Sequence, residues 1–283
     1  SAVALVASPL DAACNQMLAF VTALTAAATS TVTPLRYDLV VVGGGSAGLY
    51  AAKFARRFKK SVLLVEKERT GGDCTWTGCV PSKTLLSIAK SAHAARVASH
   101  GVSVGQVTVD MKQVKARLDS VVQDIYARDD SPEALRALGV EFLQGTATFV
   151  DADTLDVGGQ KVEATKGVVI ATGASPVSPQ IAGLQEVPHL THQTVFDLEE
   201  LPRRLTVVGG GPIGVELAQA YARLGAAVTL VGASLLPADE PEAGAVLERV
   251  LEKEGVRRVH GRAESVSSAE GTHVLVCAGA GGE

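Results

Sequence analysis

The sequence lacks the features that mark a disulfide-built scaffold, a zinc module or a polyanion-binding protein. It holds only four cysteines among 283 residues, too few to stabilise a secreted fold by disulfide bonds. No cysteine pair has histidines at the spacing of a zinc site, so we predict no metal site. The formal net charge of −4 offers no basic surface, and no nucleic-acid partner is expected. The remaining composition, 47% hydrophobic and 20% charged, is typical of a globular chain long enough for about two domains.

Residues 1–35 carry little charge, since Asp11 is their only charged side chain. Asn15, Gln16 and many hydroxyl-bearing residues make this stretch a poor membrane span, and no membrane partner is expected. Its bias toward alanine, serine and threonine is typical of a targeting remnant, whereas the absence of arginine argues against one. A plain N-terminal extension is the alternative. The expected location is therefore the cytoplasm or an organelle.

The most informative feature present is the pair Cys74 and Cys79, which lie in the segment GGDCTWTGCVPSK of residues 71–83. A disulfide needs Cα atoms roughly 4.4–6.8 Å apart, but this spacing in a straight α-helix separates them by roughly 8.6 Å. A distorted turn that leads into a helix can close the bridge, and Pro81 suits the first turn of such a helix. Cys79 would then lie near a helix N-terminus, where the pKa of a thiol is lowered. An inert disulfide and a weak metal site are the alternatives to a redox pair.

The chain contains an internal repeat. Residues 39–48 resemble residues 205–214, and the same offset relates Gly43 to Gly209, Gly45 to Gly211 and Gly48 to Gly214. Each glycine motif follows an apolar strand and opens a helix, expected over residues 46–58 and 212–224. The repeat therefore predicts two βαβ units that bind dinucleotides.

The glycines of each motif have separate tasks in a dinucleotide loop. The first permits a tight turn, the second lets the backbone approach a pyrophosphate, and the third allows close packing of helix on strand. The N-terminus of the following helix then offers backbone N–H groups to the phosphates. We therefore predict cofactor contacts from the first residues of both helices, namely Ser46, Ala47, Pro212 and Ile213.

The two units differ where the second strand ends. Glu66 ends this strand in the first unit, where an acidic side chain accepts hydrogen bonds from a ribose. Gly232 takes the equivalent position in the second unit, followed by no arginine in residues 233–236. The first unit therefore predicts a dinucleotide with an unmodified ribose, such as FAD or NAD. The choice between NAD and NADP in the second unit stays open, with a lean to NADP because the acidic marker is missing.

The segment between the units has the pattern of a helical region followed by short strands. Residues 110–138 have helical spacing, with Ser131 as an N-cap before Pro132. Two short strands are expected from residues 139 and 145, then a hairpin that turns at Gly158 and Gly159. Residues 168–173 predict a buried strand that ends at Thr172 and Gly173, and residues 175–188 a crossover between domains.

The order of these motifs resembles that of the flavoprotein pyridine nucleotide–disulfide oxidoreductases, which include mercuric reductase and dihydrolipoamide dehydrogenase. The resemblance covers roughly residues 36–237 and is carried by the first glycine loop, residues 71–83, residues 171–173 and the second loop with Glu216. Trp76 departs from it, because members commonly carry asparagine there. The implied fold is α/β, with two Rossmann-like FAD- and NAD(P)-binding domains with parallel sheets and a small antiparallel β insertion. The expected boundaries are 1–35 for the extension, 36–188 for the FAD domain and 189–283 for the NAD(P) domain.

The resemblance implies a role for each matching residue. Cys79 would be the thiol beside the flavin, Cys74 the thiol that exchanges with substrate, and Lys83 and Glu216 an ion pair beside the flavin ring. Gly72 would contact the cofactor, and Ala147 would meet the adenine through its backbone. The implied enzyme passes electrons from NAD(P)H through FAD to the Cys74–Cys79 disulfide, and from there to a small disulfide, dihydrolipoamide or a mercuric ion.

The resemblance also implies further chain. Family members are homodimers and continue for about 180 residues beyond the equivalent of Glu283, including a dimer-interface domain. We therefore expect this chain to be truncated before that domain, to bind FAD poorly and to lack efficient turnover. A non-catalytic nucleotide-binding remnant is the second hypothesis, and a flavin-free metal-binding module the third. Cys277, on an apolar strand, is expected to be buried filler rather than a second redox centre.

Overall fold

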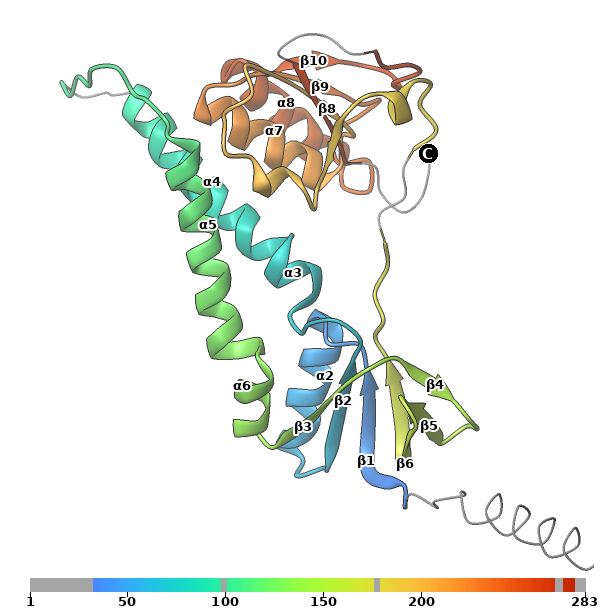
Figure 1. The fold of residues 1–283 in the computed structure, drawn as a ribbon. Helices are drawn as coiled ribbons and strands as arrows, with labels where there is room; N and C mark the ends of the chain where they lie inside the picture. The colour runs from blue at the N-terminus through green and yellow to red at the C-terminus, as the bar shows by residue number, and fades with distance from the viewer. Residues whose placement is uncertain (1–32, 98–100, 176–178, 268–271, 278–283) are drawn as a thin grey trace, which may run out of the picture.

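A computed structural model describes residues 33–97, 101–175, 179–267 and 272–277 of the chain. The described residues form two α/β units, and Figure 1 shows them one above the other. In the lower unit a sheet has the strand order β3-β2-β1-β6-β5-β4. Its strands are β1 (Leu35–Val42), β2 (Val62–Glu66), β3 (Val140–Gln144), β4 (Ala147–Phe149), β5 (Thr154–Val157) and β6 (Gln160–Ile170).

The first sheet is parallel through β3, β2, β1 and β6, and antiparallel where β5 pairs with β6 and with β4. Val40 and Val41 of β1 are both fully buried but belong to clusters on opposite faces of the sheet. Successive side chains of a strand point to opposite faces, so a continuous apolar run is what a doubly covered parallel strand requires. The parallel sheet and the small antiparallel insertion that the sequence predicted are confirmed.

The second sheet repeats this arrangement with the order β10-β9-β8-β11-β7. All its pairings are parallel. Its strands are β7 (His189–Thr191), β8 (Arg204–Val208), β9 (Ala227–Val231), β10 (Arg257–Val259) and β11 (Thr272–Val276). The repeat read from the glycine spacing is therefore present in three dimensions, with β8 and β9 standing where β1 and β2 stand.

Each glycine loop is followed by a helix at the predicted place. In the first unit α2 (Ser46–Arg57) joins β1 to β2, and in the second α7 (Pro212–Leu224) joins β8 to β9. A Cβ atom added at Gly48 would lie 1.9 Å from the Gly43 carbonyl oxygen, and one at Gly214 would lie 2.0 Å from that of Gly209. Both sites need glycine, because no side chain fits where the helix meets its loop.

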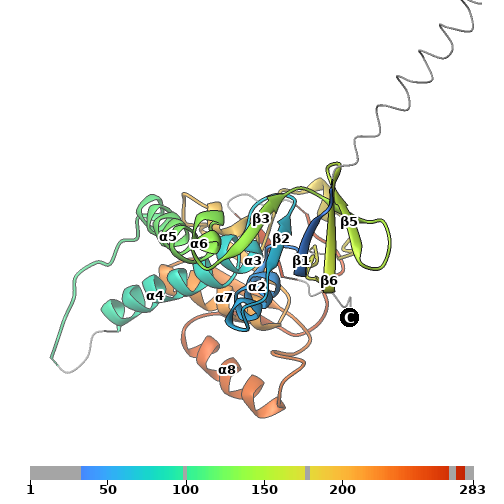
Figure 2. The ribbon, with the colours of Figure 1, turned by 90° about the horizontal axis from the view of Figure 1, so that it is seen from below.

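The helical region between β2 and β3 links the two units. It comprises α3 (Gly72–Trp76), α4 (Cys79–Arg96), α5 (Met111–Ile125), a π-helical turn η1 (Tyr126–Asp130) and α6 (Pro132–Ala137). Helices α4 and α5 run together from the first sheet to the second, as the views of Figures 1 and 2 show. Leu85 of α4 and Leu118 of α5 belong to the same buried cluster as Val215 and Leu230 of the second unit. The long helices therefore extend the core of the second unit.

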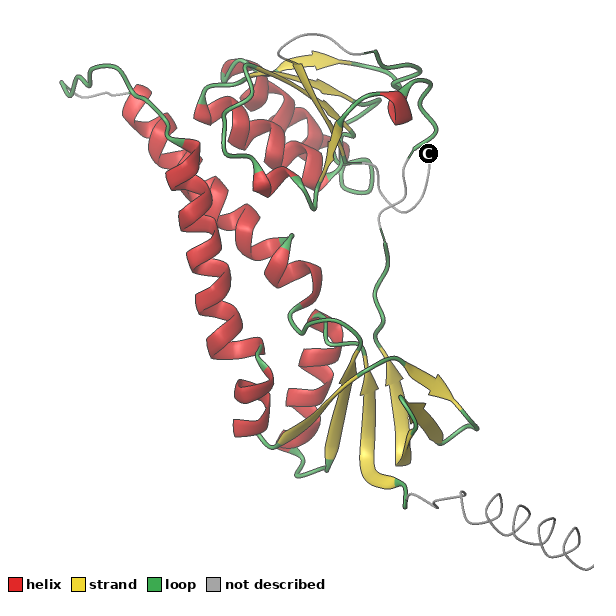
Figure 3. Cartoon of the chain, viewed as in Figure 1, coloured by secondary structure: helices red, strands yellow, loops and turns green. Residues whose placement is uncertain are grey.

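The remaining elements lie before and between the strands of the second unit. Figure 3 shows the helices and strands of both units and the loops that join them. These elements are α8 (Pro241–Lys253), which precedes β10, and the 3₁₀ turns η2 (Leu184–Glu186) and η3 (Val195–Asp197). The expected extension or targeting remnant covers residues 1–35. Of these, residues 1–32 lie outside the described residues.

Two local predictions have a definite outcome. Ser131 caps α6 by accepting a hydrogen bond from the Ala134 amide, with Pro132 in the first turn, as predicted. The prediction of a buried strand over residues 168–173 was wrong, because β6 ends at Ile170, which is 66% exposed, and none of these residues is buried. The reason is that β5 pairs only with residues 160–163 of β6, so the far end of β6 has a strand neighbour, β1, on one side.

Candidate active site

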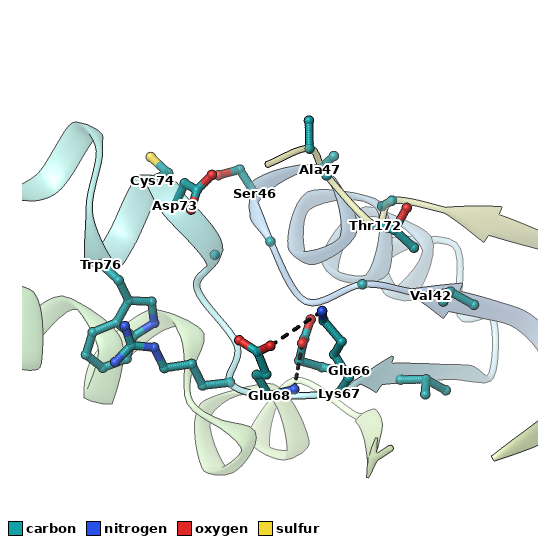
Figure 4. Close-up of a pocket in the computed structure, with 18 of the residues that line it drawn as sticks. Val42, Ser46, Ala47, Glu66, Lys67, Glu68, Asp73, Cys74, Trp76 and Thr172 are labelled. Atoms are coloured by element: carbon teal, nitrogen blue, oxygen red, sulfur yellow. Dashed lines mark hydrogen bonds and ion pairs between the residues drawn. The ribbon is translucent and has the colours of Figure 1, made fainter. Parts of the chain in front are cut away.

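The first glycine loop and the cysteine motif meet in one cavity of about 900 Å³. Its walls come from the end of β1, the start of α2, the end of β2, α3 and the segments that follow β3 and β6. Figure 4 shows Cys74 beside Asp73 and Ser46, at the opposite end of the pocket from Val42. The sequence-predicted residues that line the cavity are Gly43, Gly45, Ser46, Ala47, Glu66, Gly72, Cys74, Ala147, Thr172 and Gly173.

Glu66 is placed where the loop and the strand end meet. One carboxylate oxygen accepts a hydrogen bond of 2.6 Å from the Gly44 amide, and the other accepts one of 2.8 Å from the Glu68 amide. Oxygens that bond to backbone amides fix a carboxylate at this edge of the cavity. The side chain predicted to bind a ribose therefore also shapes the phosphate loop.

Gly72 brings the redox turn against the phosphate loop. Its φ is +57°, and a Cβ atom added there would lie 2.6 Å from the Gly45 Cα atom. The left-handed conformation and the close backbone approach both require glycine. This contact explains how residues 71–83 come to share a cavity with the first glycine loop.

The two cysteines lie on successive helices. Cys74 lies in α3 and is half-buried, whereas Cys79 is the first residue of α4 and is exposed. Both are free thiols, and the neighbouring Cys74 thiol raises the pKa of Cys79. The cavity wall includes Cys74 but not Cys79, among the residues that the structure describes. A turn between two helices therefore brings the sulfurs together, as the spacing of the pair requires.

The expectation of a lowered pKa at Cys79 was wrong in direction. The hydrogen bond with the Cys74 thiol raises the pKa of Cys79, burial raises it further, and the charge of Lys83 acts in the opposite sense. A thiol that shares its proton with a neighbouring sulfur loses that bond on ionising. The position at the N-terminus of α4 does not overcome this effect.

Lys83 and Glu216 form the expected ion pair between the two units. The Lys83 Nζ atom lies 2.7 Å from both carboxylate oxygens of Glu216, which joins α4 to α7. The two side chains are 61% and 37% exposed. The pair is solvated, so its contribution to stability is small. Lys83 lies four residues after Cys79 and is the cation closest in sequence to the dithiol.

The second glycine loop has the geometry of a dinucleotide loop. Gly211 is the N-cap of α7 and Pro212 occupies its first turn. Ile213 is 46% exposed at this helix N-terminus. Gly209 and Gly214 make the close contact described above, and Gly232 directly follows β9. The residues predicted for the second nucleotide are therefore brought together at the carboxyl end of the strands.

An arginine that sequence spacing did not reveal lies beside Gly232. Arg258 of β10 donates hydrogen bonds to the carbonyl oxygens of Leu230 and Gly232, and its side chain is only 3% exposed. A guanidinium bound in this way supports the backbone of β9. Its partners are these two backbone carbonyls and the Glu248 carboxylate at 3.3 Å, so it gives no ground for a choice between NAD and NADP.

Several cavity residues were missed by sequence reasoning. They are Lys67, Glu68, Arg69, Asp73, Trp76 and Gln193. The Arg69 guanidinium lies 3.7 Å from the centroid of the Trp76 ring, and the Trp76 indole donates a hydrogen bond of 2.8 Å to the Thr70 carbonyl. The signal available in the sequence was Trp76 itself, a departure from the family motif inside the redox segment.

Comparisons with known proteins agree with this site. The chain matches the pyridine nucleotide-disulphide oxidoreductase family over residues 37–281. It is 38% identical over 235 residues to a mercuric reductase of Streptomyces lividans, covering 81% of this chain and 49% of the relative. It is 37% identical over 203 residues to a dihydrolipoyl dehydrogenase of Mycoplasma pneumoniae, covering 70% of this chain and 44% of the relative.

Among solved structures, the Cu(II) complex of the flavoprotein disulfide reductase RclA from Escherichia coli superposes with a TM-score of 0.70 at 25% identity. The match covers 85% of this chain and 56% of that protein. The fold and the site thus define an α/β chain with two dinucleotide loops and a cysteine pair beside the first of them. The chain belongs to the pyridine nucleotide-disulphide oxidoreductase family. FAD as cofactor and NAD(P)H as co-substrate, predicted from the sequence, are confirmed for this family.

The chain is shorter than its relatives, and its described residues show neither a membrane-spanning helix nor a metal-binding cluster. It spans about half the length of the curated relatives it matches. Within the described ranges, no helix combines the length and the apolar character that crossing a bilayer requires. The same ranges contain no cluster of three or more histidine, cysteine or acidic side chains arranged to hold a metal ion.

Proposed function

We propose that the first unit binds FAD in the cavity beside Cys74 and that the second unit binds NAD(P)H at the loop before α7. The division of labour follows the predicted boundaries, residues 36–188 for FAD and 189–283 for the nicotinamide nucleotide. The observation that supports this most strongly is the shared cavity, whose wall contains the first glycine loop, Glu66 and Cys74.

The residues present fit FAD. The cavity of about 900 Å³ lies within the range of cofactor pockets, about 300–1,000 Å³. The first turn of α2 presents Ser46 and Ala47 at a helix N-terminus, which suits a pyrophosphate. Glu66 stands where a ribose would be bound, and Ala147 and Thr172 lie in the same wall. When bound, FAD supplies two-electron transfer between a nicotinamide and a pair of thiols.

The chain's own chemistry is the oxidation and reduction of its dithiol. Cys74 and Cys79 lose two electrons and two protons when one sulfur–sulfur bond forms, and regain them when it is reduced. On the resemblance, Cys74 is the thiol that we assign to exchange with substrate. Its thiolate attacks a disulfide sulfur or binds a soft metal ion. Lys83, held by Glu216, favours a negative charge on the nearby Cys79 sulfur.

The substrate class follows from this chemistry. We propose a small-molecule disulfide or dithiol, such as dihydrolipoamide, or a soft metal ion such as mercuric ion. We also propose that the working assembly is a homodimer located in the cytoplasm or an organelle. These finer assignments rest on the resemblance and on the two cysteines together.

The test is an absorbance titration of the purified 283-residue chain reconstituted with FAD. Anaerobic addition of two electrons per flavin is expected to produce a long-wavelength band that reports a thiolate next to the flavin. Cys79→Ser should abolish the band, and Cys277→Ser, a control at a cysteine outside the cavity, should retain it. A band that survives in Cys79→Ser would refute the proposal.

The remnant hypothesis makes a different prediction for the same preparation. The chain would retain nucleotide-binding loops but would bind FAD poorly and show no NAD(P)H–disulfide turnover. Its support is the presence of both dinucleotide loops, which would bind nucleotides with or without turnover. Retained flavin with full turnover would exclude it, and a colourless chain that cannot be reconstituted would favour it over the enzyme.

A further inference from the structure

The π-helical turn η1 is bound to the redox turn by a buried hydrogen bond that the proposed function does not use. The Thr75 hydroxyl donates to the Asp130 carboxylate at 2.7 Å. Thr75 is 4% exposed and Asp130 is 8% exposed, so the bond is shielded from water. Thr75 directly follows Cys74, so this bond anchors a residue next to the first thiol.

The same carboxylate is tied to the helix that begins at the phosphate loop. The Lys53 Nζ atom of α2 lies 3.2 Å from the other oxygen of Asp130 and donates a hydrogen bond of 2.6 Å to the Asp129 carbonyl. Asp130 therefore bridges α3 and α2, two of the elements that line the cavity. A charge-assisted and buried pair of bonds fixes geometry more firmly than an exposed one.

Aromatic packing reinforces the contact from the same turn. Tyr126, the first residue of η1, has its ring centroid 4.9 Å from that of Trp76. The opposite side of the redox turn carries Arg69 over the Trp76 ring. Trp76 and Thr75 thus attach α3 to both ends of η1. π-Helical turns are rare in proteins, and those that do occur often lie at functional sites.

We propose that η1 positions the dithiol, with Asp130 as the positioning residue. It holds Thr75, and with it Cys74, in the register that lets Cys74 and Cys79 close into a disulfide. The inference rests on the proposed redox role of the pair. The physical reason is that an anchored turn loses less conformational freedom when the ring closes, which raises the effective concentration of one thiol at the other.

The consequence is measurable without flavin. In a glutathione buffer the two thiols give two electrons and two protons to one glutathione disulfide, forming one intramolecular bond and releasing two glutathione molecules. The equilibrium constant of this exchange reports the effective concentration. Loss of a buried hydrogen bond to a carboxylate is expected to lower the constant about tenfold, which raises the midpoint potential by about 30 mV.

The experiment uses the full chain equilibrated over a series of glutathione ratios, then trapped with an alkylating reagent. Cleavage after Arg69 and Lys83 releases residues 70–83, so both cysteines are measured in one peptide by mass. Thr75→Val keeps the shape and removes the hydroxyl, and should lower the constant about tenfold. Thr75→Ser keeps the hydroxyl and should restore it. Asp130→Asn tests the bond from the acceptor side and should shift the constant in the same direction.

Thr70→Val is the matched control. Thr70 is 1% exposed in the same region, and its hydroxyl has no hydrogen-bond partner among the described residues. Its removal should leave the exchange constant unchanged. If Thr75→Val fails to fold, as judged by circular dichroism, the exchange constant of Asp130→Asn tests the inference instead.

Three results would overturn the inference. They are a constant within twofold of the wild type in the folded Thr75→Val and Asp130→Asn chains, failure of Thr75→Ser to restore it, and an equal shift in Thr70→Val. A wild-type chain that forms no intramolecular disulfide would overturn the proposed function as well. If the disulfide forms normally and its exchange constant does not depend on Thr75, only the role of η1 is overturned.

Discussion

Cys277 makes the stability of the second unit sensitive to alkaline pH. This thiol is 8% exposed at the end of β11, where its amide donates to the Val208 carbonyl below the second glycine loop. Burial raises its pKa from 9.0 to about 12. The folded state therefore keeps the proton while the unfolded state loses it. The resulting stabilisation is complete below pH 9 and is lost as the pH rises toward 12.

The magnitude follows from linkage. One proton released only on unfolding lowers the free energy of unfolding by about 1.4 kcal/mol at pH 10 relative to pH 8. Urea titrations at both values, followed by circular dichroism, measure the difference. Other groups also titrate in this range, so the comparison is with Cys277→Ala, which lacks the thiol. The variant should lose about 1.4 kcal/mol less than the wild type over the same interval.

A cavity left by the alanine lowers stability at every pH and does not affect this difference. Equal pH dependence in the two chains would refute the reasoning, because it would mean that the thiol ionises as readily in the folded state. Rapid alkylation of Cys277 in the native chain at pH 8 would refute it by a second route. Either result would also reopen the interpretation of this residue as buried filler.

Two further predictions concern charged pairs of different exposure. Arg223→Met should lower the free energy of unfolding by about 3 kcal/mol at pH 7, because it leaves Glu254, whose side chain is 10% exposed, without its cation. Burial acts to raise the pKa of Glu254 but the Arg223 bonds lower it overall. The difference in free energy of unfolding between wild type and variant, measured by urea titration, should therefore shrink as the pH falls below 4.5 and through the lowered pKa of Glu254. A difference under about 1 kcal/mol at pH 7 would contradict the burial argument. Lys83→Met should cost less than about 1 kcal/mol, since the lysine is 61% exposed, yet it should raise the pKa of Cys79 further. The pH profile of Cys79 alkylation measures this, with Lys90→Met on the same helix as control; equal profiles in the two variants would contradict it.

Sequence reasoning reached the repeated βαβ architecture because its signals are local. The glycine spacing, the apolar strands and the helix caps each depend on a few neighbouring residues, as the capped start of α6 at Ser131 shows. The hairpin at Gly158 and Gly159 is of the same kind, with β5 and β6 paired on either side. Each of these features was predicted near its observed boundary.

Part of the candidate site was also predicted from local signals in the sequence. The cysteine spacing predicted a distorted turn that leads into a helix, and the structure has such a turn before α4, with the unpredicted short helix α3 ahead of it. The pKa of Cys79 was predicted in the wrong direction, because the helix N-terminus is visible in the sequence but the bond with Cys74 is not. The partnership of Lys83 with Glu216 across 133 positions came from the resemblance and not from the pattern of residues.

The sequence by itself determined the two dinucleotide loops, the helices that they open and the dithiol that follows the first loop, because short-range sterics and periodicity specify them. Tertiary structure alone decided that Thr75 is anchored to Asp130, that α4 and α5 pack into the second core, and that Arg258 lies beside Gly232. These contacts join residues tens of positions apart. They depend on how whole elements pack together, and no local pattern of residues records that arrangement.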